Sequence, residues 1–186
     1  MAKSYDLSNL AVLIADKNMQ MRRLMRSVMR EMNIRMVTEA SATEEAYSLL
    51  AAKPFDMAFV EWSPDFDGIA IVRQLRRDIK AASRYVPVVV MSAYTELQHV
   101  LDARDAGGNE FLAKPFTARL IYSRIQALIE NHRPFIKCKI YFGPDRRRKK
   151  SPPPDGWERR NKDATENKET ADKTKTEKTK SESTSA

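Results

Sequence analysis

Five residues with reactive side chains come directly after short apolar segments of the sequence. They are Asp16, Lys17, Glu61, Ser92 and Lys114. Together they supply two carboxylates, two ammonium groups and one hydroxyl, a set that can bind a cation or a phosphate group. No glycine-rich phosphate loop accompanies them, which argues against nucleotide binding at these residues. No nucleophile stands beside a general base either, so we do not expect an enzyme.

The segments that position these side chains alternate between two periodicities. Residues 10–15, 57–60 and 86–91 are apolar runs of strand length, and stretches with apolar residues three and four positions apart separate them. A weaker run around Val37 and a short one at residues 111–112 complete five strand and helix pairs. This alternation predicts an α/β domain with a parallel sheet. Because ligands bind beyond the carboxyl ends of such strands, we expect the reactive side chains to converge on one pocket.

The net charge of +8 is concentrated in one short part of the chain. Residues 1–131 contain 17 basic and 16 acidic residues, residues 132–162 contain 11 and 3, and residues 163–186 contain 5 and 6. The last segment has no large apolar side chain to offset the entropy of ordering, so we expect a disordered polar tail there. We therefore divide the chain into a domain over residues 1–131, a basic extension over residues 132–162 that is partly docked, and a tail over residues 163–186.

Composition excludes some classes of protein. Cys138 is the single cysteine and the chain has two histidines, which excludes an internal disulfide and makes a Cys/His zinc site implausible. No run of about 18 apolar residues is present, and the first residues lack the apolar segment of a secretory signal. We expect a cytoplasmic protein without a transmembrane segment.

In its first two thirds the chain resembles the receiver domain of two-component response regulators, the CheY-like family. The resemblance covers about residues 8–131 and depends on four motifs in order. These are VLIADKN at residues 12–18, DG at residues 67–68, VPVVVMSA at residues 86–93 and AGGNEFLAKPF at residues 106–116. The resemblance implies a doubly wound, flavodoxin-like fold with a five-stranded parallel sheet in the order 2-1-3-4-5.

The resemblance also implies a chemistry. In this family an aspartate after the third strand accepts a phosphoryl group from a partner histidine kinase, and Mg²⁺ held by that aspartate and by an acidic pair after the first strand neutralises the developing charge. Ser92 and Lys114 match the hydroxyl and the lysine that bind the phosphate, and Phe111 matches the aromatic switch position. Three features depart from the pattern. Glu61 stands at the acceptor position, Lys17 replaces the second member of the acidic pair, and the following loop is shorter than usual and lacks the usual Met before Pro64.

These departures change the charge balance of the pocket. Asp16 and Glu61 against Lys17 and Lys114 sum to zero without a metal, whereas the family's three carboxylates and one lysine need a divalent cation. We expect Lys17 to take the place of Mg²⁺ by pairing with Glu61 or Asp16, which leaves Asp16 as a residual metal ligand at best. We also expect Glu61 to hold Ser92 and Lys114 in an active-like arrangement. The sequence thus predicts a pseudo-receiver that acts without Mg²⁺ and without phosphorylation.

Two alternatives to the pseudo-receiver stay open. In the first, the pocket has decayed, and Glu61 and Lys17 form a partly exposed ion pair worth about 0 to 1 kcal/mol. In the second, the domain still accepts a phosphoryl group, on Glu61 or on Asp65 or Asp67. The loop over residues 62–68 that carries these two aspartates is one residue shorter than usual in the family. It must fold back into the pocket for either aspartate to serve.

The family resemblance points to a partner face as well. Receiver domains usually signal through their fourth helix, fifth strand and fifth helix, a face that here includes Tyr94, His99, Phe111, Arg119 and Tyr122. We expect a histidine kinase or another phosphorelay component to bind it. A homodimer through the same face is a further option.

The basic extension combines apolar and basic residues. Its apolar residues are Phe135, Ile136, Ile140, Tyr141 and Phe142, too many for a free linker, so we expect the segment to dock on its own domain or on a partner. A basic run follows, made of Arg146, Arg147, Arg148, Lys149 and Lys150. A different class of function is therefore that residues 133–162 bind nucleic acid or an anionic surface. A solvated basic tail is the simpler interpretation, because no DNA-reading motif such as a helix-turn-helix fits here.

Overall fold

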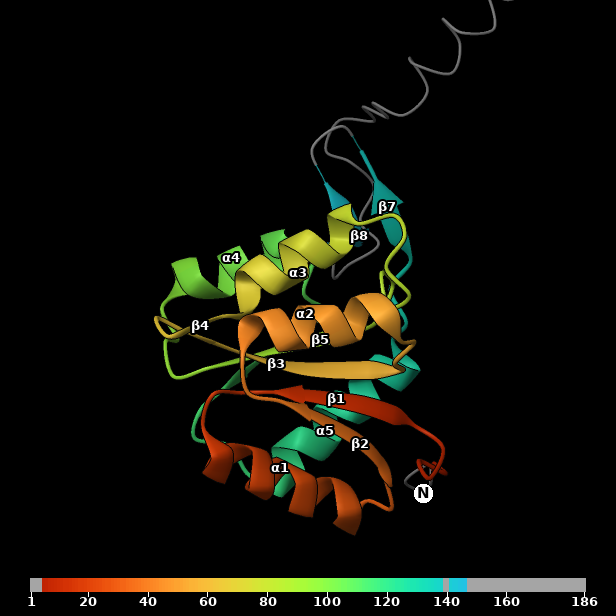
Figure 1. The fold of residues 1–186 in the computed structure, drawn as a ribbon, viewed down its shortest axis with the longest axis vertical. Helices are drawn as coiled ribbons and strands as arrows, with labels where there is room; N and C mark the ends of the chain where they lie inside the picture. Colours follow the sequence, from red (N-terminus) through yellow and green to blue (C-terminus); the bar gives the residue numbers. More distant parts are fainter. Residues whose placement is uncertain (1–4, 139–140, 147–186) are drawn as a thin grey trace, which may run out of the picture. The chain divides into compact units, whose positions relative to one another are not determined.

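A five-stranded parallel sheet lies between two layers of helices, as Figure 1 shows. The computed structural model describes residues 5–138 and 141–146. The order of the long strands, β2-β1-β3-β5-β6, confirms the predicted 2-1-3-4-5 order. These strands are β1 (Ala11–Ala15), β2 (Met36–Ala40), β3 (Met57–Ser63), β5 (Val88–Ser92) and β6 (Glu110–Ala113). The predicted tail and residues 147–162 of the basic extension lie outside the described residues.

Five helices cover the two faces of the sheet. They are α1 (Met19–Glu31), α2 (Thr43–Ala52), α3 (Gly68–Arg77), α4 (Leu97–Ala106) and α5 (Ala118–Glu130). Helices α1 and α5 pack on one face, and α2, α3 and α4 pack on the other (Figure 1). No helix in the described part of the chain is long and apolar enough to cross a membrane.

Alternation along each strand divides the core into two layers. In β1, Val12 and Ile14 pack against α1 and α5, whereas Leu13 and Ala15 pack against the opposite helices. Successive side chains of a strand point to opposite faces, so a strand covered on both sides must be apolar at every position. This is why β5 is an uninterrupted buried run. On α1, Met25 and Met29 are fully buried against this sheet, whereas Met19 at the start of the helix is exposed.

The short loop after β3 folds into a tight hairpin. A two-residue strand, β4 (Phe66–Asp67), runs antiparallel to the end of β3, with Trp62 opposite Asp67. Helix α3 follows at once, and the Asp67 side chain caps it by accepting the Ala70 N–H at 2.9 Å. Gly68 is required at this point because a Cβ there would lie 2.1 Å from the Glu61 carbonyl oxygen. The loop is therefore fastened along the end of β3.

After α5 the chain forms a second hairpin against α3. Strands β7 (Phe135–Lys137) and β8 (Phe142–Pro144) pair with each other and not with the main sheet. The ring of Phe142 lies 5.3 Å from that of Tyr85 between centroids, and Arg133 pairs with Glu110 of β6 at 3.3 Å. The layered α/β part ends with α5 at Glu130, and the compact unit extends to Arg146.

Candidate functional site

The carboxyl ends of four parallel strands bring four of the predicted side chains together. Asp16 follows β1, Glu61 belongs to the end of β3, Ser92 ends β5, and Lys114 follows β6. Asp16 and Ser92 are fully buried, and the side chains of Glu61 and Lys114 are each 13% exposed. The carboxyl ends of parallel strands lie at one edge of the sheet, so these four side chains come close together.

Lys114 bridges the two carboxylates of this pocket. Its ammonium lies 2.8 Å from Oδ2 of Asp16 and 2.7 Å from Oε1 of Glu61. The other Asp16 oxygen accepts the Asn18 N–H at 2.8 Å, and the other Glu61 oxygen accepts the Lys17 N–H at 3.0 Å. All four carboxylate oxygens thus already accept a hydrogen bond from the protein.

The pKa values of the two carboxylates are shifted in opposite directions. Burial raises the pKa of Asp16 above its usual value, against the lowering by the hydrogen bond from Lys114. Burial also acts to raise the pKa of Glu61. There, however, the hydrogen bonds with Lys114 and Asp16 and the ammonium charge outweigh it, so the pKa of Glu61 is lowered. The shared lysine thus favours the ionised form of Glu61, whereas burial disfavours the ionised form of Asp16.

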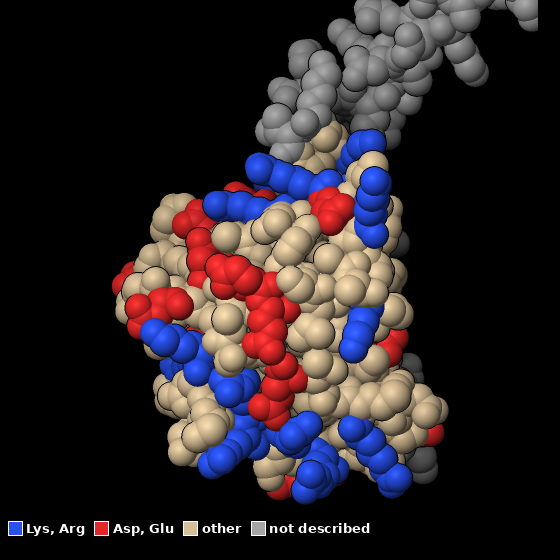
Figure 2. Space-filling model, in the orientation of Figure 1, with Lys and Arg blue, Asp and Glu red and all other residues tan. Residues whose placement is uncertain are grey.

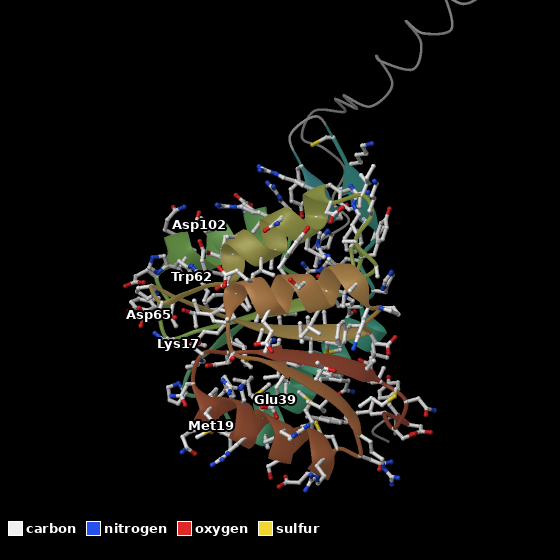
Figure 3. The ribbon with its side chains drawn as sticks, in the orientation of Figure 1. Lys17, Met19, Glu39, Trp62, Asp65 and Asp102 are labelled. Atoms are coloured by element: carbon white, nitrogen blue, oxygen red, sulfur yellow. The ribbon has the colours of Figure 1, made fainter. Side chains whose placement is uncertain are left out.

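The prediction that the Lys17 ammonium pairs with Glu61 or Asp16 is wrong. Only the backbone N–H of Lys17 reaches Glu61, and its ammonium lies 3.2 Å from Asp65 at the tip of the β3–β4 hairpin (Figure 3). Asp16 must point inward to meet Lys114, and the next side chain points out of the pocket. In place of the predicted neutral set of four charges, the structure has a buried trio of Asp16, Glu61 and Lys114. The exposed ion pair of Lys17 and Asp65 lies at the rim of this trio.

Neither loop aspartate enters the pocket. The side chain of Asp65 is 73% exposed, and that of Asp67 is held as the cap of α3. The loop over residues 62–68 does not fold back into the pocket, so neither aspartate lies where it could replace Glu61 as acceptor.

The expected contact between Glu61 and Ser92 is also not formed. The Ser92 hydroxyl donates to the carbonyl oxygen of Trp62 at 2.7 Å and accepts the Tyr94 N–H at 3.0 Å. Glu61 therefore holds Lys114 but leaves Ser92 bound to the backbone. Phe111, at the switch position, is half-buried and packs against the core under α2, α3 and α4.

Sequence reasoning missed Arg22, which holds the loop that carries Asp16. Its guanidinium donates to the carbonyl oxygens of Asp16 at 2.7 Å and Lys17 at 3.1 Å. The same side chain pairs with Glu39 of β2 at 3.3 Å (Figure 3 labels Glu39). An arginine in the first turns of an amphipathic helix carries no distinguishing signal, because its partners come from a loop and from a neighbouring strand.

The residues of the predicted partner face separate into two groups. Tyr94 and His99 surround Trp62, with ring centroids 6.3 and 4.5 Å from it, and a cavity of about 290 Å³ adjoins these three rings. Arg119 is exposed on α5, and the half-buried Tyr122 packs against the core under α1 and α5.

Only the first member of the basic run lies within the described residues. Arg146 pairs with Asp105 of α4 at 3.3 Å and covers the ring of Tyr141 at 3.8 Å. Arg147, Arg148, Lys149 and Lys150 lie outside the described residues.

The residues present do not form the metal site that the fold family uses. Mg²⁺ prefers several oxygen ligands in octahedral geometry. Within residues 5–138 and 141–146, no group of three or more His, Cys, Asp or Glu side chains could hold a metal ion. The pocket offers two carboxylates, and a lysine ammonium already bridges them.

The chain is similar to known proteins of one family. The family model described as the response regulator receiver domain matches residues 12–126. Chemotaxis protein CheY of Pseudomonas aeruginosa is 28% identical over 120 residues, which cover 64% of this chain and 95% of that protein. Chemotaxis protein CheY-3 of Vibrio cholerae is 27% identical over 123 residues, covering 66% and 93%. The solved receiver domain of Francisella response regulator 1452 is 25% identical with a TM-score of 0.58, covering 66% and 98%. By the family model that matches residues 12–126 and by its strand order, this chain belongs to the response regulator receiver domain family.

Proposed function

We propose that this receiver domain signals by protein contact, independently of Mg²⁺ and of phosphorylation. The observation that carries the proposal is the bridge of Lys114 between Asp16 and Glu61. In a two-component pathway the domain would then be a constitutive contact module whose pocket is closed by its own side chain.

The bridge opposes metal binding in two ways. A Mg²⁺ ion at the two carboxylates must take oxygens that now accept hydrogen bonds from Lys114 and from backbone N–H groups. It would also lie about 4 to 5 Å from the Lys114 ammonium, a repulsion of several kcal/mol at an effective dielectric constant of about 20. The family's third carboxylate, which offsets this repulsion elsewhere, is Lys17 here.

The same contacts oppose phosphoryl transfer to Glu61. One of its oxygens is bound by Lys114 and the other by the Lys17 N–H. Phosphoryl transfer depends on positioning and on neutralising the charge of the transferred group, a task that a divalent cation performs in this family. Without that cation, a carboxylate that must first release both partners is a poor acceptor.

The connection between the pocket and the surface runs through Trp62. Its carbonyl oxygen binds the Ser92 hydroxyl, and its ring contacts His99 on α4. A protein that binds Tyr94 and His99 therefore contacts rings whose position depends on Trp62, and Trp62 is fixed by its bond to Ser92 in the closed pocket. We propose a histidine kinase or another phosphorelay component as that partner, on the face formed by α4, β6 and α5.

The test uses Trp62 as a fluorescent reporter in a Trp157→Phe variant of the full chain, so that the basic extension contributes no tryptophan signal. Mg²⁺ and then a beryllofluoride phosphate mimic are titrated, and intact mass is measured after incubation with a small phosphodonor. We expect no fluorescence change up to millimolar Mg²⁺ and no added phosphate. Saturable quenching together with a phosphoryl mass shift would show a working phosphoacceptor and overturn the proposal.

A matched variant makes a negative result meaningful. Lys17→Asp with Glu61→Asp, in the same Trp157→Phe background, restores the three carboxylates of the family pattern. We expect this variant to respond to millimolar Mg²⁺. If it responds and the parent does not, the reporter is sensitive, and the residues at positions 17 and 61 account for the missing response of the parent.

A further inference from the structure

A second cavity lies at the edge of the sheet opposite to the carboxylate pocket. It has a volume of about 460 Å³ and is bounded by the last turns of α3 and α4, by Arg84 and by the β7–β8 hairpin. In parallel strand and helix units, the helices return from the carboxyl edge of the sheet, so their C-terminal ends reach the other edge. A volume between about 300 and 1,000 Å³ is usual for sites that bind small molecules.

The walls of this cavity are strongly basic. Arg73, Arg76 and Arg77 of α3 line it together with Arg84 and Lys137, and the acidic residue that lines it is Asp105. Figure 2 shows Lys and Arg side chains gathered where α3 meets the hairpin.

Within residues 5–138 and 141–146, carboxylates do not balance the charges of these walls. Asp105 already pairs with Arg104 at 2.9 Å and with Arg146 at 3.3 Å. Among the described residues, none of the four lining arginines has a carboxylate oxygen within ion-pair distance. The C-terminal ends of α3 and α4 contribute about half a negative charge each. Five cations against one carboxylate and two helix ends leave an excess of about three positive charges.

One of the lining arginines, Arg76, is buried and held in a fixed position. Its side chain is 2% exposed, and its guanidinium donates to the carbonyl oxygens of Gly107, Val86 and Arg84. It also lies 4.9 Å from the ring centroid of Phe135 in the hairpin. A buried arginine whose partners are neutral carbonyls remains a source of positive potential for the cavity.

The hairpin wall is held by its own contacts. Arg84 stacks on the Phe142 ring at 3.9 Å, and the Tyr141 hydroxyl donates to the Pro144 carbonyl at 2.8 Å. A side chain at Gly143 would have its Cβ 2.5 Å from the Tyr141 hydroxyl, so the glycine allows this close packing. The cavity is thus formed without a ligand, which reduces the ordering cost of binding one.

We propose that this cavity binds a small organic molecule that carries two or more phosphate groups. Guanidinium groups match phosphate oxygens with paired hydrogen bonds, and an excess of about three charges matches two or three linked phosphates. The volume corresponds to about fifteen water molecules at roughly 30 Å³ each, which is more than one phosphate ion fills. This site is separate from the carboxylate pocket and does not depend on how that pocket functions.

The test is calorimetric titration of the full chain with ATP, pyrophosphate and inorganic phosphate at one fixed ionic strength. We expect ATP and pyrophosphate to bind at least about tenfold more tightly than inorganic phosphate. The variant Arg73→Gln with Arg77→Gln removes two exposed charges of the cavity and should weaken ATP binding by at least about tenfold. Arg23→Gln with Arg30→Gln makes the same change of charge on the exposed face of α1 and should leave the affinity unchanged.

Three results would overturn the proposal. They are an equal loss of affinity in the α1 control, no binding of either polyphosphate below millimolar concentration, and an unchanged affinity in the cavity variant. A further variant, with glutamine at positions 147 to 150, identifies the source in the last case. If only that variant loses binding, the basic run and not the cavity attracts the anion.

Discussion

The ammonium of Lys17 lies 3.2 Å from Asp65, outside the pocket that its neighbour Asp16 enters. The two side chains are 61% and 73% exposed, so water screens their attraction. We expect Lys17→Ala to change the free energy of unfolding by less than about 1 kcal/mol, measured by urea denaturation. A larger loss would mean that Lys17 contributes to the buried charges.

The same variant separates two explanations of the closed pocket. In the Trp157→Phe background, Lys17→Ala should not respond to millimolar Mg²⁺, because Lys114 still bridges both carboxylates. A response to Mg²⁺ on removal of Lys17 alone would assign the closure to Lys17 instead.

Removal of Lys114 should be far more costly. Lys114→Met keeps most of the side-chain volume but leaves Asp16 and Glu61 as neighbouring buried carboxylates without their shared cation. We expect a loss of about 3 to 5 kcal/mol in the free energy of unfolding at neutral pH. Lys53→Met, at an exposed lysine, is the control and should change stability little. Similar values for the two variants would contradict the role of Lys114.

Glu61 should make the stability depend on pH. Its pKa in the folded protein is lowered from the ordinary 4.5, so the folded state binds that proton less tightly than the unfolded state. Its contribution is therefore fully present above the unfolded pKa and is lost as pH falls through the folded pKa.

We expect Glu61→Gln to destabilise the domain by about 2 kcal/mol at neutral pH, because a charge-assisted hydrogen bond is weakened. The difference from the parent should shrink as pH is lowered below 4.5. Denaturation curves recorded across this range test it. The control Glu31→Gln, at an exposed position, should show no such pH dependence. A difference that stays constant down to low pH would argue against an ionised Glu61 at Lys114.

Arg76 should control the docking of the β7–β8 hairpin. Arg76→Met leaves the carbonyl oxygens of Val86 and Gly107 without their donor and removes the cation next to Phe135. Each buried acceptor left without a partner costs about 1 to 3 kcal/mol, so we expect a loss of at least about 2 kcal/mol. Faster hydrogen exchange of the Cys138 and Asp145 amides, which bond within the extension, should accompany it.

A milder variant tests the same contact in case Arg76→Met does not fold. Phe135→Leu removes the ring over Arg76 but keeps the guanidinium and its carbonyl partners, and should cost about 0.5 to 2 kcal/mol. The exchange of the same two amides should still rise. Unchanged exchange in this variant would show that the hairpin docks without this contact.

The arrangement of the sheet could be predicted because a strand that is covered on both faces is apolar at nearly every position. The runs ending near Ala15, Val60 and Met91 identify their strands for that reason. Strand β4 was not predicted, since two residues are too few to show a period. The β7–β8 hairpin was anticipated only as an apolar segment that docks, because its pairing depends on contacts with α3.

The sequence by itself determined which chemical groups meet at the carboxyl edge of the sheet, because the end of each parallel strand is a local feature. It placed Asp16, Glu61, Ser92 and Lys114 in one pocket, and it placed Lys17 there too, which was wrong. Only the tertiary structure decided how these groups pair: Lys114 with both carboxylates, Lys17 with Asp65, and Ser92 with the Trp62 carbonyl. The physical reason is that ion pairs form over a few ångströms between residues distant in the chain. The direction of each side chain is set by loop backbone that takes its shape only when the helices pack.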